Sequence, residues 1–508
     1  MKKISFLLLL SVLLPLLSCE SGCKVSGQKL SEEVLSDKLK GAWAGQIIGC
    51  TYGGPTEFRY QGTMIPDSVQ IPWGQGEIKK WFDDGGGLYD DIYMDLTFIE
   101  ALDKYGLDAS ADDFASTFLS KGFALCHSNQ QSRYNLQHGC SATESGYWRN
   151  NPHADCLDFQ IEADFAGIVT PGMANSAADI CDRAGHMLAY GDGWYGGVYV
   201  AAMYSLAYVY TDITKVVEDA LKVIPEQSRF HSCISSVIRW HQENPSDWRW
   251  CWQQIEDHWA RTDITCPDGV DTPFNIETCL NASYIVLGLL YGDGDFFKTI
   301  DIATRAGQDS DCNPSSAAGV LGAMIGYEAI PEVYTAEVEA VADRPFNHSM
   351  SFNAACRVSQ ELMLEAIRSN GGRANGDDLI LPVQRPEPVR LEKSFEGLAL
   401  DRKVPVGNWI AAFPEVRFEG VGAVISGQLQ ADERVPADYV ALLDVFFNEE
   451  LIERCELPLD YNKRKHELFF NYDRPAGNYK ISCRWVNPVE GADIWVRDVI
   501  TYKENNRN

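Results

Sequence analysis

The spacing of the apolar residues changes once along this chain, near residue 371, and this change limits its fold more than any other feature. Before that point, apolar residues recur at helical intervals, as at positions 35, 39, 42, 43 and 47. This first helical segment stops at Gly53-Gly54-Pro55, a strong helix breaker. Further helical windows are 92–105, 112–126, 173–190, 197–210, 214–224, 231–242, 275–291, 296–306, 314–327 and 352–369. The first two thirds of the chain therefore predict an all-α domain over residues 31–370.

After residue 392 the pattern is that of strands. From Tyr479 to Trp485 apolar and polar residues alternate, and 439–447, 451–457, 466–472 and 492–502 look similar. Short strands with turn signals over about 110 residues predict a β-sandwich over 393–505, either a carbohydrate-binding module or an appendage that packs on the helices. Residues 371–392, rich in Gly, Asn, Asp and Pro, predict a linker. The expected fold class is mainly α, with an added β-sandwich.

Residues 1–18 have the features of an export signal. Lys2 and Lys3 precede an apolar run that is too short to span a bilayer comfortably and that ends at Ser18-Cys19. A cysteine placed directly after a small residue there resembles a bacterial lipobox, with Cys19 lipidated after cleavage; an ordinary cleaved signal is the alternative. We expect membrane attachment through a lipid at Cys19 in the bacterial envelope, in the outer membrane and facing the periplasm or the surface. Residues 19–30 would be a tether.

The net charge and the cysteine content further limit the kind of protein and its partners. The 508 residues include 43 Lys and Arg against 72 Asp and Glu, a net charge of −29, which argues against nucleic acid as a partner. The 15 cysteines are scattered through apolar segments, without a CxxC pair or a cluster of zinc spacing. We expect mostly buried free thiols, with Cys455 and Cys483 as the best candidate disulfide pair because both lie in strand-like segments.

The first acidic motif is Tyr89-Asp90-Asp91, with Asp95 one turn further on. Adjacent aspartates at the start of a helix lie about 100° apart around its axis, so one cation could contact both. Asp95 falls on the same face as Asp91. The alternative is simple N-terminal charge, because acids favour first turns.

The second motif is Gly307-Gln-Asp309-Ser-Asp311-Cys-Asn313-Pro314. Asn313 predicts an N-cap and Pro314 the first position of a helix over 315–327, so Asp309 and Asp311 should converge from the preceding loop. Ligands that offer only oxygen indicate Mg²⁺, Mn²⁺ or Ca²⁺ and not zinc. A turn rich in Asp and Asn, or an incidental calcium site, is the alternative.

The third motif starts at Gly45 and ends at Pro55-Thr56-Glu57. Small residues recur every four positions in this helix, which predicts tight packing in a bundle, and the glycine-rich exit presents Glu57. Taken alone, a glutamate after a turn is usually just solvated.

In order and spacing, the three motifs together resemble the ADP-ribosylglycohydrolase family. The middle of the chain also resembles a long-insert branch of that family, through the segments 158–165, 171–172 and 191–197. The resemblance implies an orthogonal all-α bundle with a binuclear Mg²⁺ or Mn²⁺ centre. It makes Asp90, Asp91, Asp309 and Asp311 metal ligands, Glu57 and Asp91 catalytic, and Asp95, Asp164, Tyr195 and Gly196 substrate-binding. Two residues depart from the pattern: Tyr89 stands where threonine is usual, and Cys312 replaces the final threonine. Because a thiol is a poor magnesium ligand, these departures put the second metal ion in doubt.

The resemblance implies a hydrolase of a glycosidic bond to ribose, ADP-ribose or a related furanosyl group. The export signal and the β domain favour a role in extracytoplasmic scavenging. Its substrate would be a small molecule or a glycan. A glycoside hydrolase acting on plant or host polysaccharide through the same centre is the first alternative. An inactive sugar-binding protein that keeps the fold is the second.

Overall fold

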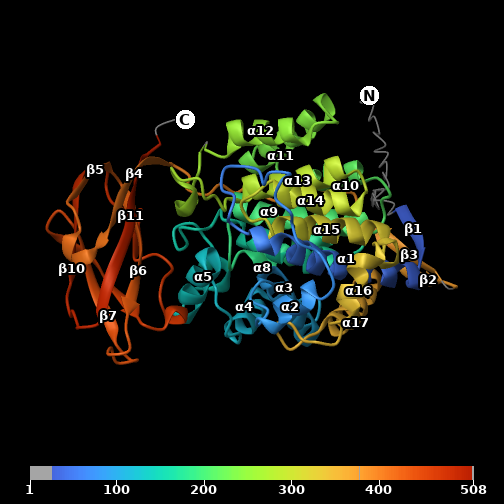
Figure 1. Cartoon of the computed structure of the whole chain (residues 1–508), viewed down its shortest axis with the longest axis horizontal. Helices are drawn as coiled ribbons and strands as arrows, with labels where there is room; N and C mark the ends of the chain where they lie inside the picture. Colours follow the sequence, from blue (N-terminus) through green and yellow to red (C-terminus); the bar gives the residue numbers. More distant parts are fainter. Residues whose placement is uncertain (1–25, 262, 377, 506–508) are drawn as a thin grey trace, which may run out of the picture.

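A computed structural model describes residues 26–261, 263–376 and 378–505, which form a helical domain followed by a β-sandwich (Figure 1). The expected fold class is confirmed. The export signal and Cys19 lie outside the described residues. Within the described part, no helix combines the length and the apolar character needed to cross a membrane.

In the part of the chain that the structure describes, seventeen α-helices build the first domain. They are α1 (Glu32–Gly53), α2 (Glu77–Asp83), α3 (Asp90–Tyr105), α4 (Ala111–Leu119), α5 (His127–Gln137), α6 (Ala142–Ser145), α7 (Asp164–Ile168), α8 (Ala174–Gly185), α9 (Asp192–Ala207), α10 (Ile213–Ala220), α11 (Arg229–Glu243), α12 (Trp248–Trp259), α13 (Thr278–Gly292), α14 (Phe296–Arg305), α15 (Cys312–Ile325), α16 (Glu332–Glu339) and α17 (Phe352–Ser369). The central helices α1, α9, α13 and α15 are buried over most of their length, because they are apolar or small on all sides.

Helices α1 and α15 pack backbone to backbone. A Cβ added at Gly45 would lie 2.2 Å from the Ala318 carbonyl oxygen, and one at Gly49 would lie 2.2 Å from that of Pro314. The small residues spaced every four positions therefore allow the close approach that the sequence predicted. As a result, the C-terminal end of α1 and the N-terminal end of α15 lie together.

The helix boundaries that differ from the prediction include those of α15 and α4. Helix α15 begins at Cys312 with Asp311 at the N-cap position, and Pro314 lies inside its first turn, where a missing N–H breaks no helical hydrogen bond. The Asn313 side chain does not cap the helix but donates to Asn281 Oδ1 at 3.0 Å. The 112–126 window forms only α4, which ends at Leu119, shortly before Gly122.

The segments expected as tether and linker contribute a three-stranded antiparallel sheet. Its order is β1 (Ser26–Ser31), β3 (Asp378–Val383) and β2 (Arg373–Asn375), and it lies at the end of the helical domain remote from the sandwich (Figure 1). The chain after it also packs on the helices, since Gln384 N–H donates to Gly172 C=O at 2.9 Å and Val389 N–H to Val223 C=O at 2.8 Å. This stretch is therefore a strap along the helical domain.

The second domain has two four-stranded antiparallel sheets, ordered β5-β10-β7-β8 and β4-β11-β6-β9. The strands are β4 (Leu398–Trp409), β5 (Val416–Gly420), β6 (Gly422–Ala431), β7 (Val440–Phe447), β8 (Glu450–Pro458), β9 (Phe469–Asn471), β10 (Gly477–Trp485) and β11 (Ala492–Glu504). One apolar core contains residues of both sheets. A further apolar cluster joins Trp148 and Val270 of the helical domain to Phe395, Tyr472 and Tyr502. The sandwich thus packs on the helices.

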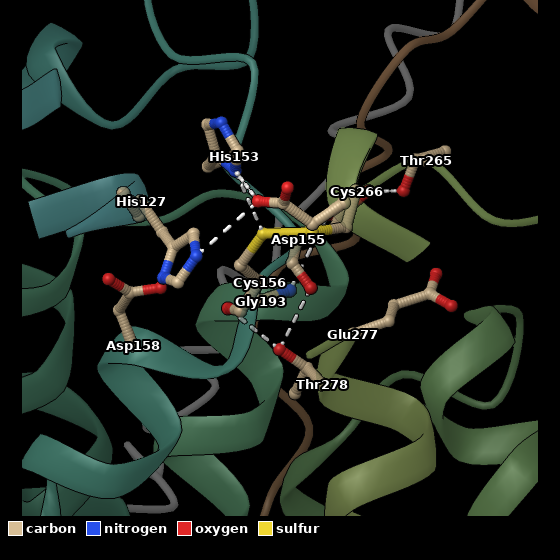
Figure 2. The surroundings of a disulfide bond; sticks show 12 residues. His127, His153, Asp155, Cys156, Asp158, Gly193, Thr265, Cys266, Glu277 and Thr278 are labelled. Carbon is tan, nitrogen blue, oxygen red and sulfur yellow. Dashed lines mark hydrogen bonds and ion pairs between the residues drawn. A yellow bond between two sulfur atoms is a disulfide. The ribbon is translucent and has the colours of Figure 1, made fainter. Parts of the chain in front are cut away.

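The prediction of a Cys455–Cys483 disulfide is wrong. Both cysteines are free, because β7 lies between their strands: Cys455 pairs with Leu443 and Cys483 with Val445. Cysteines two strands apart are about 10 Å from each other, too far for a disulfide. The disulfide present joins Cys156 and Cys266, whose Cα atoms are 5.7 Å apart (Figure 2). Eleven other cysteines of the described part are free and mostly buried.

Candidate metal centre

Glu57 is brought beside Asp309 by two loops that hydrogen bond to each other. Phe58 N–H donates to the Gln308 carbonyl at 3.0 Å, and Gln308 N–H donates to the Tyr60 carbonyl at 2.9 Å. Phe58 and Gln308 have φ values of 50° and 55°, a left-handed backbone that is costly for residues other than glycine. The paired loops hold these conformations, and through them the position of Glu57.

The N-terminal ends of two helices meet at the same place. Asp90 and Asp91 are the first residues of α3, and Asp311 immediately precedes α15. Both helix ends carry N–H groups without helical partners and a partial positive charge, which favours carboxylates.

The carboxylates of these elements lie within reach of one cation. The ligand atoms of Glu57, Asp309 and Asp311 all lie within 4.8 Å of one another, and so do those of Asp90, Asp311 and Cys312. Asp311 belongs to both groups, and its Oδ1 is buried without a hydrogen-bond partner in the described part of the chain. Carboxylate oxygens at this spacing fit a hard divalent cation with ligand distances of about 2.0–2.6 Å. The roles of these residues as ligands remain a prediction.

Asp91 lies deeper than its neighbour. Its side chain is buried, and one carboxylate oxygen accepts from Ile92 N–H at 2.8 Å. Of the described residues, Asp90 belongs to the groups of ligand atoms and Asp91 does not. The structure therefore favours Asp90 over Asp91 as a direct ligand.

The crowded carboxylates disfavour one another's charge. Burial and then the charge of Asp309 raise the pKa of Glu57 to about 7. Burial, followed by the charges of Asp309 and Glu57, raises the pKa of Asp90 to about 7 as well. Glu57 is the exposed member, so it faces incoming solvent or substrate. A divalent cation between these groups would relieve the repulsion.

The two residues that depart from the family pattern differ in where they point. The Tyr89 hydroxyl lies 2.8 Å from Thr51 Oγ1, and its ring packs against Phe82 inside the bundle. The Cys312 thiol instead lies among the acids, with Sγ 3.9 Å from Asp90 Oδ1. Cys312 thus presents sulfur to the centre, whereas Tyr89 serves the core.

Asp95 and Asp164, expected to bind substrate, lie inside the bundle. Gln46 Nε2 donates to Asp95 Oδ2 at 2.9 Å and to Asp164 Oδ2 at 2.7 Å. The other oxygen of Asp95 accepts from Phe165 N–H at 3.0 Å. These contacts join α1, α3 and α7, so the structure gives the pair a role in packing.

Tyr195 and Gly196, also expected to bind substrate, are buried in α9. The Tyr195 hydroxyl donates to the Arg390 carbonyl at 3.0 Å and so holds the strap on the helices. A Cβ at Gly196 would lie 2.2 Å from Thr278 Cγ2, so its lack of a side chain lets α13 approach. These contacts are structural, and substrate binding by the two residues stays a prediction.

The insert between residues 126 and 165 brings to the centre further polar residues that were not among the predicted site residues. Burial first, and then other charges that include Asp90, raise the pKa of Asp158 to about 6 and that of Glu162 well above its usual range. His127 lies beside Asp158 (Figure 2) and, at φ 43°, is a further left-handed residue. Their signal in the sequence was the run of polar residues in the insert, which did not show which of them are buried.

The sandwich holds this insert in place. Gln130 Nε2 donates to the carbonyls of Tyr461 and Arg464, each at 2.8 Å, and Arg133 donates to Asn462 Oδ1 at 2.8 Å. The loop around η7 (Tyr461–Lys463) therefore supports α5 from the second domain.

A histidine cluster where the two domains meet has side chains of the kind that bind metal ions, but these side chains are hydrogen bonded and ion paired within the protein. His127, Asp268 and His466 have ligand atoms within 4.8 Å of one another. However, His466 Nδ1 accepts from the backbone N–H of His127 at 3.1 Å, so the neutral ring carries its proton on Nε2. Asp268 is paired with Arg497, whose NH2 group lies 2.7 Å from Oδ1. The cluster joins the two domains by hydrogen bonds and ion pairs.

Comparison with known proteins gives one family. The family model described as ADP-ribosylglycohydrolase matches residues 31–360, well over half of the chain. Among solved structures, an "ADP-ribosylglycohydrolase-related protein complex" is 13% identical, with a TM-score of 0.45, and the match covers 66% of this chain and 99% of that one. No curated protein matches at a significant level.

Proposed function

The chain belongs to the ADP-ribosylglycohydrolase family, and we propose that it is a divalent-metal-dependent hydrolase of a glycosidic bond to ribose, ADP-ribose or a related furanosyl group. The observation that carries this proposal is the meeting of Glu57, Asp90, Asp309 and Asp311, from distant parts of the sequence, around one volume. Such a set of oxygen ligands suits Mg²⁺ or Mn²⁺.

Asp309 and Asp311 would hold one ion, together with Glu57 or a water. Asp90 and Asp311 would lie beside a second ion. An ion bound there supplies positive charge that orients sugar hydroxyls and lowers the pKa of a coordinated water. Cys312 stands where an oxygen ligand would complete the second position, so that position is the weaker of the two.

Glu57 is the residue best placed to move a proton. It is exposed, and within the described part of the chain no hydrogen bond of its carboxylate fixes it to the fold, so it can face the scissile bond. We assign it the transfer of a proton to the leaving group or from the attacking water. The buried carboxylates provide negative charge that stabilises an oxocarbenium-like state at the sugar.

We also propose that the protein acts outside the cytoplasm, tethered to the outer membrane by a lipid at Cys19. The sequence of residues 1–19 supports this location. Scavenging of sugars or nucleosides suits an enzyme in this place.

A metal-supplemented screen tests the activity, with α-ribosides, ADP-ribosyl-arginine and pentofuranosides as substrates. We expect turnover with Mg²⁺ or Mn²⁺ and loss by at least about 100-fold in Asp309→Ala, since that variant removes a ligand. The variant should unfold at the same temperature as wild type without metal, because it also removes a repelling buried charge. Equal activity of variant and wild type would refute the site.

A further inference from the structure

We infer that Asn129, Asp158 and Glu162 form the sugar-binding part of the site, and that they select a neutral, non-phosphorylated glycoside whose hydroxyl groups donate to them. This inference rests on the proposed function and narrows its substrate class. The three side chains are linked to each other: Asn129 N–H donates to Asp158 Oδ1 at 3.0 Å, and Asn129 Nδ2 donates to Glu162 Oε1.

The remaining oxygen of each side chain is what points to a ligand. Asn129 Oδ1, Asp158 Oδ2 and Glu162 Oε2 are buried and have no hydrogen-bond partner in the described part of the chain. The residues are only 7%, 6% and 1% exposed. Buried polar atoms are nearly always paired, and leaving one unpaired costs about 1–3 kcal/mol. Three such acceptors on three residues that hydrogen bond to one another call for a ligand that brings several donors.

These acceptors adjoin the metal centre. Asp158 and Glu162 are the second and last residues of η2 (Leu157–Glu162), which packs against α3, the helix that begins at Asp90. The charge of Asp90 acts on both residues. A sugar held with its hydroxyls on Asp158 and Glu162 would therefore have other oxygens towards Asp90, so that binding and chemistry would take place on one sugar ring.

The surrounding charge excludes phosphate. The charge of Asp90 acts on both Asp158 and Glu162. A pyrophosphate or phosphate that took the place of the sugar on Asp158 and Glu162 would be repelled by these carboxylates.

A guanidinium ligand fits less well than hydroxyls. Guanidinium prefers both oxygens of one carboxylate. Here one oxygen of Asp158 and one of Glu162 already accept from Asn129, so each carboxylate offers a single oxygen. Separate hydroxyl groups match three separate acceptors.

Binding measurements on the purified, Mn²⁺-loaded protein test the inference. The probes are methyl β-D-ribofuranoside, ribose 5-phosphate, ADP-ribose and arginine, titrated calorimetrically. We expect the neutral riboside to bind most tightly, and Asp158→Asn and Glu162→Gln each to weaken it about tenfold, since each replaces an acceptor by a donor. Glu256→Gln is the matched control. Glu256, a half-buried residue of α12, accepts a hydrogen bond from the Tyr284 hydroxyl of α13, and its replacement should leave riboside binding unchanged.

Tighter binding of ADP-ribose, ribose 5-phosphate or arginine than of the riboside would overturn the inference, as would unchanged riboside affinity in both variants or no riboside binding at all. If one variant fails to unfold cooperatively, Asn129→Ser provides the same test with a smaller change. Failure of the proposed function has a different signature: the riboside binds through Asp158 and Glu162, but no glycoside is hydrolysed with any metal.

Discussion

Cys312 places sulfur among the carboxylates of Asp90 and Asp311, at a position where an oxygen would suit a hard cation better. In the proposed centre, this single side chain would set how well a second ion is held. The effect is local, because the thiol is buried at the start of α15 and its neighbours are already in place.

We predict that Cys312→Thr tightens Mg²⁺ binding roughly tenfold by adding a hydroxyl ligand. Isothermal titration with Mg²⁺ measures this. Cys312→Ala is the matched control, since it removes the thiol without adding an oxygen and should bring no gain. Equal affinity of the Thr and Ala variants would mean that position 312 does not face the ion.

At the scale of elements, the pairing of α1 with α15 positions the centre. We predict that Gly49→Ala lowers the free energy of unfolding by about 1–3 kcal/mol, because the new Cβ would lie 2.2 Å from the Pro314 carbonyl oxygen. This loss exceeds the gain of about 0.5–1 kcal/mol that alanine usually brings to a helix. Denaturant unfolding measures it, with Gly122→Ala as control, since a Cβ at Gly122 meets nothing within 4 Å. A Gly49→Ala variant as stable as wild type would contradict the close approach.

The Cys156–Cys266 disulfide joins the insert to the segment before α13 and closes a loop of 110 residues. Replacing both cysteines by serine should lower the free energy of unfolding by about 2–4 kcal/mol, since the unfolded chain gains freedom. Chemical unfolding under non-reducing conditions checks this. Cys126→Ser, at an exposed free thiol, is the control and should leave stability unchanged. No difference between the two variants would argue that the bond does not form.

At the scale of the whole molecule, a buried histidine cluster joins the two domains. Burial lowers the pKa of His153 to about 4 and that of His466 to about 3. His153 Nε2 lies 2.9 Å from Glu467 Oε1 of the sandwich, and the charges of His127, His153 and Arg497 hold the pKa of Asp268 well below its usual range.

These shifts predict how His153 contributes to stability as pH changes. The unfolded chain binds a proton at His153 near pH 6.5 and the folded chain only near pH 4. The free energy of unfolding therefore falls by up to about 3 kcal/mol as the pH falls from 6.5 to 4. Over this pH range, the free energy of unfolding of wild type should fall by that amount relative to that of His153→Gln. His258→Gln, at an exposed residue of α12, is the control. Unfolding free energies measured at several pH values decide it, and a constant difference for His153→Gln would refute the prediction.

The sequence by itself determined the elements and their order. Apolar spacing identified eleven of the helices and the change to strands, because the periods of 3.6 and 2 residues are local properties of the chain. The acidic motifs and the glycine spacing of α1 likewise identified Glu57, Asp90, Asp309 and Asp311 as candidates, since each motif is a short run of neighbouring residues. The polar helix α5 lacked such a period and was missed. Helix α12 was also missed, although Trp248, Trp252 and Ile255 follow a helical spacing.

Only the tertiary structure decided which side chains share a volume. Tyr195, Asp95 and Asp164 match a family pattern, yet they pack in the core, whereas Asn129, Asp158 and Glu162 are brought to the centre by α5 and η2. The strand β7 between Cys455 and Cys483, and the meeting of Cys156 with Cys266, follow from strand order and loop path. Neither is a local property, because contacts between distant segments depend on how the whole chain packs.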